Sequence, residues 1–201
     1  DIPTPLLMAR GYLHYFESFN SDKILLDSAK MYLDKVDDKD ISYQKVLIHY
    51  YYLKGDFKKI IETAPKIKDK KSFDAWTAYR VGEAYQNNEV FESAVVFYGL
   101  AVEQEKYNLD FNFKLATAHV FTGNVKAAEQ LFNFIITENP TYQKAWNNLG
   151  VIQAGSGRFE EAENSLLRAV QLDPDYVLSR LKLAELYIQT RLRSNAREVV
   201  C

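Results

Sequence analysis

The feature that most constrains the fold of this chain is a 34-residue period. Three series of positions keep it: the small residues Gly82, Ala116, Gly150 and Ala184, the small residues Ala94, Ala128, Ala162 and Ala196, and the large apolar residues Tyr98, Phe132, Leu166 and Val200. Pro140 and Pro174 are separated by the same interval. Because several independent positions share one period, the chain is predicted to be an array of similar units.

Each unit is predicted to contain two helices joined by a short polar turn, with the turns at 87–89, 122–124 and 155–157. A small residue on the first helix faces one on the second, as with Gly150 and Ala162, so that the two backbones approach closely. Pro174 ends one unit and opens the next, because proline lacks an N–H group and fits the first turn of a helix. A single pair cannot bury both of its faces, so stacking on neighbouring units must stabilise it.

The motif Trp146-x2-Leu149-Gly150, followed by Ala162-x3-Leu166 and Pro174, resembles the tetratricopeptide repeat. The resemblance implies an all-α, right-handed superhelical solenoid of antiparallel helix-turn-helix repeats. Residues 143–176 match best, although Gln153 replaces the aromatic residue that sister units supply.

One continuous solenoid is expected: a degenerate N-terminal helical pair at 1–40, a divergent repeat at 41–74, repeats at 75–108, 109–142 and 143–176, and a truncated repeat at 177–201. Ile48 and Ile60 replace both small residues of the divergent repeat, so its pair is expected to be splayed or shifted. The last unit should end about two turns into its second helix. That end would leave Leu192, Ala196, Val199 and Val200 to be covered by a continuation of the chain or by another chain.

Composition narrows the classes of function. The net charge of −2 provides no general attraction to nucleic acid. Residues 41–72 hold eight lysines against three acids, so binding of an acidic partner to this segment remains an alternative. The single cysteine, Cys201, excludes an intrachain disulfide framework, and no apolar run reaches the roughly 18 residues that span a bilayer. The start at Asp1 without methionine indicates a processed protein or a segment of a longer one. The compartment stays open, with the cytoplasm favoured over the periplasm.

No constellation of catalytic residues is recognisable. Gly150, Gly155 and Gly157 have roughly the spacing of a phosphate loop, but Ser156 stands where such a loop needs lysine. These glycines also end a helix, where backbone carbonyls repel phosphate. The histidines lie far apart, without metal-binding spacing, and His119 is expected to be packed. The chain is therefore predicted not to be an enzyme and to use no cofactor or metal.

The resemblance implies that the first helices of the units line a concave groove. Projection of these helices gives the candidate groove residues Tyr52, Trp76, Tyr79, Phe113, Phe121, Asn147, Asn148, Leu178 and Lys182. Arg80 and Lys114 join them because they stand where relatives place residues that contact a partner. Aromatic residues would bury a partner segment, while amides and cations would set its register. Relatives that grip a C-terminal carboxylate use a set of lysine, asparagine and arginine that His49, Arg80 and Asp110 break, so that mode is disfavoured.

The predicted function is a non-catalytic protein–protein interaction scaffold that binds a peptide or protein segment in the groove. Two alternatives stay open: a structural module that self-associates through its uncapped C-terminal face, and a regulatory arm of a larger multidomain protein. The sequence does not name the partner or the organism, because this fold serves many kinds of machinery.

Overall fold

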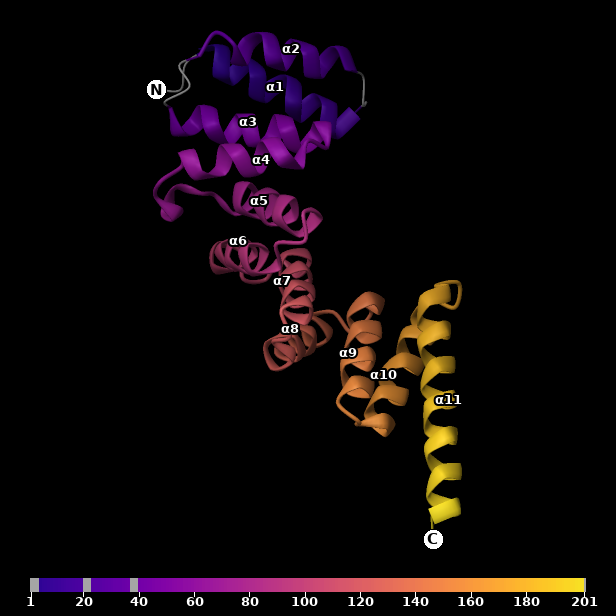
Figure 1. Cartoon of the computed structure of the whole chain (residues 1–201). Helices are drawn as coiled ribbons and strands as arrows, with labels where there is room; N and C mark the ends of the chain where they lie inside the picture. The colour runs from indigo at the N-terminus through magenta and orange to yellow at the C-terminus, as the bar shows by residue number, and fades with distance from the viewer. Residues whose placement is uncertain (1–3, 20–22, 37–39, 201) are drawn as a thin grey trace. The chain divides into compact units, whose positions relative to one another are not determined.

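The computed structural model describes residues 4–19, 23–36 and 40–200, of which 192–200 are described as helical backbone. This part of the chain is all-α, as the sequence predicts (Figure 1). Its α-helices are α1 (Thr4–Phe19), α2 (Lys23–Leu33), α3 (Ile41–Lys54), α4 (Phe57–Thr63), α5 (Ala75–Asn87), α6 (Phe91–Gln104), α7 (Leu109–Phe121), α8 (Val125–Glu138), α9 (Gln143–Gly155), α10 (Phe159–Leu172) and α11 (Val177–Val200). Two 3-10 turns, η1 (Ala64–Lys66) and η2 (Lys70–Ser72), follow α4.

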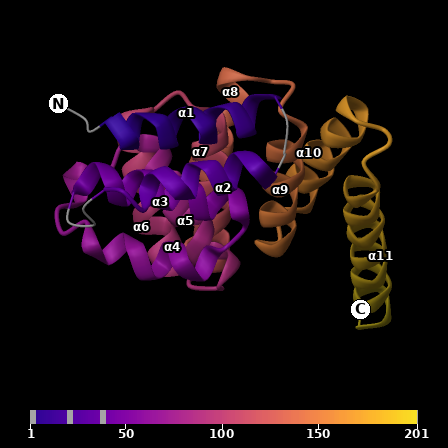
Figure 2. The same cartoon turned by 90° about the horizontal axis from the view of Figure 1, so that it is seen from above.

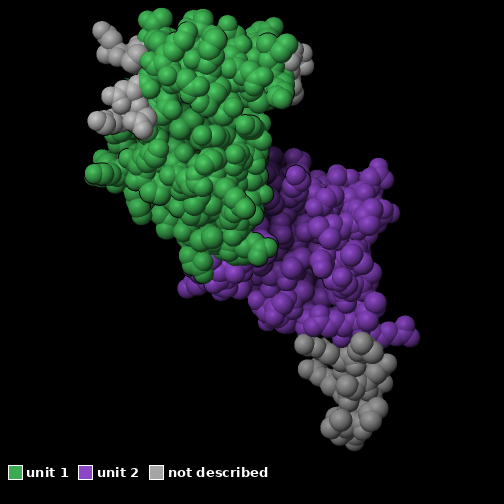
Figure 3. Space-filling model, turned by 45° about the horizontal axis from the view of Figure 1, so that its top comes forward, with its two compact units in different colours: residues 1–111 green, residues 112–201 purple. Residues whose placement is uncertain are grey.

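The chain divides into two compact units, residues 1–111 and 112–201 (Figure 3). Their boundary falls within α7. Unit 1 contains the helical pairs α1–α2, α3–α4 and α5–α6, and its first helices pack in order, α1 on α3 and α3 on α5. In unit 2, α9 packs beside α10, as both views show (Figures 1 and 2). Helices α8 and α11 flank this pair.

The period is visible in the backbone of the turns. Gly55, Glu89, Gly123 and Gly157 have positive φ angles of 73°, 60°, 75° and 78° and are spaced 34 residues apart. Each lies where the first helix of a pair ends, a position at which a left-handed residue closes the helix. The repeated sequence interval therefore corresponds to a repeated backbone conformation.

Helix α11 departs from this pattern. Arg191 stands at the next interval, and the helix runs through it for 24 residues without the turn and second helix that the sequence led us to expect. Arginine is a good helix former, and a continuous helix avoids the backbone strain of a left-handed residue with a Cβ, a strain that Glu89 bears at the equivalent position. The side chains of Leu192, Ala196, Val199 and Val200, and the whole of Cys201, lie outside the described residues.

The core of unit 1 explains the divergent repeat. Ile48 and Ile60, which replace the small residues, are both fully buried in one cluster with Ala78 and Val81. Helix α4 has seven residues and gives way to η1, in which Pro65 occupies the first turn. The second helix of this pair is therefore half the length of α6, α8 and α10, which have 14 residues each.

Candidate functional site

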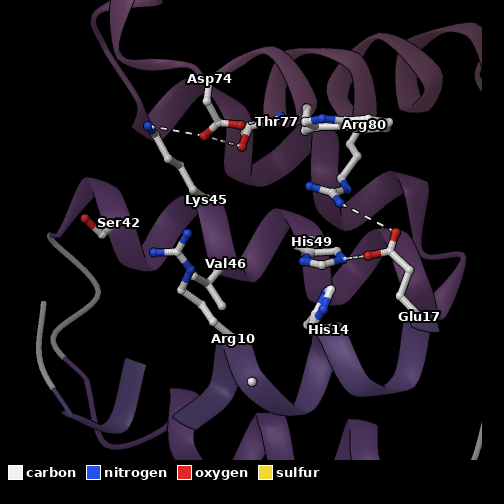
Figure 4. Close-up of a pocket in the computed structure, with 12 residues that line it drawn as sticks. Arg10, His14, Glu17, Ser42, Lys45, Val46, His49, Asp74, Thr77 and Arg80 are labelled. Atoms are coloured by element: carbon white, nitrogen blue, oxygen red, sulfur yellow. Dashed lines mark hydrogen bonds and ion pairs between the residues drawn. The ribbon is translucent and has the colours of Figure 1, made fainter. Parts of the chain in front are cut away.

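The first helices of unit 1 line a cavity of about 640 Å³, which we call the first-helix cavity (Figure 4). Its lining residues are Arg10, Gly11, His14 and Glu17 of α1, Ser42, Lys45, Val46 and His49 of α3, and Asp74, Trp76, Thr77 and Arg80 at the start of α5 and along it. On each helix the polar residues recur at intervals of three or four, so that they share one face. The polar faces of α1, α3 and α5 thus line one cavity.

Hydrogen bonds at the starts of two helices hold the edge of the cavity. Asp40 accepts a hydrogen bond from the Ser42 amide at 2.7 Å, and Asp74 accepts one from the Thr77 amide at 2.8 Å and one from the Thr77 hydroxyl at 2.9 Å. Asp74 also lies 3.4 Å from the Lys45 ammonium. Burial would raise the pKa of Asp74, but the hydrogen bonds from Thr77 and the charge of Lys45 outweigh it and lower that pKa. Asp74 is therefore a stable anion that links α5 to α3.

The cavity carries an excess of positive charge. It is lined by three cations, Arg10, Lys45 and Arg80, against two acids, Glu17 and Asp74. Glu17 reaches across from α1, where Oε1 lies 3.7 Å from an Arg80 terminal nitrogen and Oε2 lies 3.3 Å from His49 Nε2 (Figure 4). Within the described part of the chain, no carboxylate forms an ion pair with Arg10. The surplus cation is thus on α1.

His49 and Arg80 are both desolvated. Burial, reinforced by the charge of Arg80, lowers the pKa of His49 to about 3, so its imidazole is neutral near neutral pH. The Arg80 side chain is 12% exposed, its Nε atom is buried without a hydrogen-bond partner, and burial lowers its pKa. Its guanidinium carbon lies 5.6 Å from the centre of the Tyr52 ring, within the range of a cation–π contact. The cavity therefore holds a cation whose hydrogen-bonding capacity is not fully used.

The four predicted groove residues of unit 1 have different surroundings. Trp76 and Arg80 line the cavity. Trp76 is 49% exposed, and its ring centre lies 4.9 Å from that of Phe111 in an edge-to-face arrangement. Tyr79 stacks on Phe111 at 5.0 Å, and Tyr52 donates a hydrogen bond to Glu83 at 2.5 Å. Both tyrosines are half-buried packing residues beside the cavity.

In unit 2, the structure places the predicted residues at separate positions. Phe113 packs on Phe132 and Tyr142, while Asn148 donates to the Lys144 carbonyl of its own helix. Phe121 and Leu178 are exposed, Lys182 pairs with Glu185 at 2.9 Å, and Lys114 is half-buried.

Asn147 is a buried contact between helices. It is 4% exposed, and its Oδ1 accepts a hydrogen bond from the Ser179 hydroxyl at 3.0 Å. That hydroxyl accepts in turn from the Gln143 amide at 2.8 Å. The chain of bonds joins α9 to α11, so Asn147 contributes to packing between these helices rather than to an exposed surface.

Sequence reasoning did not select the residues that α1 contributes, Arg10, His14 and Glu17. A signal for them exists, because Arg10–His14 and Lys45–His49 both place a cation and a histidine four residues apart on a first helix. The two pairs are offset by 35 residues rather than 34, so the repeat period does not align them.

The described residues form neither a membrane-spanning helix nor a cluster of metal ligands. None of their helices combines the length and apolar character that a membrane crossing requires. Among the same residues, no group of three or more His, Cys, Asp or Glu side chains is arranged to hold a metal ion.

Comparison with known sequences finds the same repeat. The tetratricopeptide repeat model matches residues 144–176. The chain is 38% identical over 82 residues to the TPR repeat-containing thioredoxin TTL4 of Arabidopsis thaliana, covering 39% of this chain and 12% of that protein. It is 39% identical over 62 residues to the protein O-mannosyl-transferase TMTC2 of Homo sapiens, covering 31% of this chain and 7% of that protein. The chain thus spans a small part of the curated relatives that it matches.

Comparison with solved structures supports the fold. YrrB, described as a TPR protein with an unusual peptide-binding site, superposes with a TM-score of 0.71 at 19% identity, over 85% of this chain and 96% of YrrB. MamA gives a TM-score of 0.68 at 18% identity, over 79% and 86% of the two chains. The first TPR of Spaghetti (RPAP3), bound to the HSP90 peptide SRMEEVD, gives 0.56 at 20% identity, over 58% and 93%. With its 34-residue period and its helix-turn-helix pairs, the chain carries a tetratricopeptide repeat at 144–176 and has the fold of solved TPR repeat structures.

Proposed function

We propose that this chain is a non-catalytic interaction scaffold that binds a segment of a partner protein against the first helices of its repeats. The observation that carries the proposal is the first-helix cavity, where three successive first helices present charged side chains and an exposed indole to one space of about 640 Å³. A volume of this size is within the range of protein ligand sites. The exposed face of Trp76 offers apolar contact area, and the cations beside it offer orientation.

The chemistry of the cavity favours binding over catalysis. A general base works best with a pKa near the operating pH, whereas His49 has a pKa of about 3. Asp74 is committed to capping α5 and to pairing with Lys45. YrrB and the RPAP3 complex, which share the fold, are described with peptide sites, and we extend peptide binding from them to this chain as part of the proposal.

The proposal is tested by screening the whole chain against an array of overlapping peptides and measuring the affinity of each bound peptide by fluorescence polarisation. Trp76→Ala and Lys45→Gln should each weaken binding about tenfold, because one removes apolar contact area and the other an orienting charge. Lys126→Gln on α8 is the matched control for charge and should leave the affinity unchanged. An array without bound peptides, or full affinity in both cavity variants, would contradict the proposal.

Self-association is a second candidate, favoured by the exposed apolar residues of α11. Val177, Leu181 and Ile188 are 66%, 49% and 61% exposed. A helix face of this kind is a typical surface for contact with another chain. Light scattering at several concentrations separates this candidate from a scaffold that works as a monomer.

A further inference from the structure

We propose that the first-helix cavity binds an acidic side chain of the partner segment, and that Glu17 is an internal competitor which this side chain displaces. The inference rests on the proposed function and names the chemistry of the ligand and a way in which its binding is regulated.

Glu17 shows that the cavity accommodates a carboxylate. Its side chain extends from α1 toward α3 and α5, and its two oxygens lie near His49 Nε2 and the Arg80 guanidinium (Figure 4). One carboxylate of the chain therefore already occupies the space between three helices.

Glu17 is held weakly enough to be displaced. Its distances of 3.3 Å to His49 and 3.7 Å to Arg80 exceed the roughly 2.7–2.9 Å of a charge-assisted hydrogen bond. The imidazole is neutral near neutral pH, so only Arg80 supplies a full opposite charge at this distance. The Glu17 side chain is also 44% exposed, and ion pairs that solvent screens contribute little to stability.

A carboxylate from a partner would give Arg80 and Arg10 hydrogen bonds and ion pairs that Glu17 does not supply. Arg80 is mostly buried with an unsatisfied Nε, and a guanidinium binds best when a carboxylate meets two of its N–H groups in parallel. Arg10 has no acidic partner within the described part of the chain. An acidic side chain that enters from a partner can approach these cations more closely than Glu17, which is constrained by its own helix.

The neighbours of the cations favour a side chain over other anions. Gly11, Val46 and Trp76 also line the cavity and suit the methylene stem of a glutamate. A chain terminus would bring backbone amides to this apolar wall, where unpaired polar groups are costly. Once Glu17 is displaced, Asp74 alone leaves a surplus of two positive charges, which one entering carboxylate reduces to one and a polyphosphate exceeds.

The test uses three labelled peptides and the whole chain, measured by fluorescence polarisation. The first alternates glutamate and alanine with both ends blocked, the second has glutamine in place of glutamate, and the third is the glutamine peptide with a free C-terminus. Wild type should bind the glutamate peptide best. Glu17→Gln should raise its affinity about threefold, because the competitor loses its charge. Glu62→Gln on α4 makes the same change in net charge away from the cavity and should have a much smaller effect.

The outcomes separate the inference from the proposed function. Equal binding of the glutamate and glutamine peptides would overturn the carboxylate assignment, and tighter binding of the free C-terminus would overturn the assignment to a side chain. Equal effects of Glu17→Gln and Glu62→Gln would overturn the role of Glu17 as a competitor. If array peptides bind at the cavity without an acidic residue, the scaffold function stands and the inference fails. Arg10→Gln, at an exposed residue, should weaken binding of the glutamate peptide, and circular dichroism checks that each variant is folded.

Discussion

At the scale of single residues, the chain uses glycine for two different purposes. At Gly55, Gly123 and Gly157 an added Cβ would meet no atom within 4 Å, so these glycines serve the left-handed backbone of the turn. At Gly82 and Gly150 an added Cβ would lie 2.7 Å from Tyr98 Cδ1 and 2.6 Å from Leu166 Cγ. These two glycines serve close packing between paired helices.

Glu89 takes the left-handed conformation at the turn position where the other repeats have glycine. Glu89→Gly should therefore raise the free energy of unfolding by about 0.5 kcal/mol, because relief of roughly 1–2 kcal/mol of backbone strain is partly offset by the greater entropy of glycine in the unfolded chain. Urea unfolding measures the change. Glu92→Gly, within α6, should instead lower stability by about 1 kcal/mol, and equal losses in both variants would contradict the argument.

At the scale of elements, buried polar side chains join neighbouring helices of unit 2. Ser165 donates a hydrogen bond to Gln153 at 2.7 Å and links α10 to α9, while Ser179 links α11 to α9 through Asn147. Gln153, which replaces the aromatic residue of the sister units, is 6% exposed. The polar residue in that packing position is therefore satisfied by a hydrogen bond from the paired helix.

Ser179→Ala should lower the free energy of unfolding by about 1–3 kcal/mol. The change removes the hydroxyl that bonds to the Asn147 oxygen and to the Gln143 amide. Ser179 is fully buried, and polar groups left unpaired beside a buried position lower the free energy of unfolding. Thermal and urea unfolding measure the loss. The half-buried Ser93 on α6 provides the control, since Ser93→Ala should change stability by less than about 0.5 kcal/mol. Matching effects at the two serines would count against the hydrogen-bonded contact.

At the scale of the whole molecule, the partly buried His49 side chain should make stability depend on pH. The pKa of His49 falls from 6.5 to about 3 on folding, through burial and the nearby charges of Arg80, His14 and Arg10, while Asp74 opposes them. Below about pH 6.5 the unfolded chain therefore binds a proton that the folded chain does not. Stability is lost as the pH falls from that value toward the folded pKa.

The loss should approach about 1.4 kcal/mol per pH unit for the single proton. Urea unfolding between about pH 7 and pH 5 measures this slope, and His49→Gln, which keeps a neutral polar side chain, should reduce it. NMR titration should show the His49 imidazole unprotonated throughout that interval. A slope that is the same in wild type and His49→Gln would show that other groups control the pH dependence.

The fold class and the candidate site differ in how far the sequence could predict them. The series through Gly82 and Gly150, the turn at Gly157 and the repeat at 143–176, which the family model matches at 144–176, could be predicted because each depends on residues at a constant spacing. Trp76 was selected by helical spacing and Arg80 by the resemblance to relatives that bind a carboxylate, and both line the cavity. Glu17 was not selected, because the helical pair that carries it is outside the regular period.

The all-α repeat is encoded locally, since helix formation, turn conformation and the approach of paired helices depend on residues within one unit of 34. Three properties came from the tertiary structure: the cavity shared by α1, α3 and α5, the burial of Asn147 under α11, and the unbroken course of α11 through Arg191. Each depends on which neighbouring helix covers a side chain or leaves it uncovered. A helical projection shows the direction of a side chain but not the partner that it meets, and the charge, burial and hydrogen bonding of the first-helix cavity depend on that partner.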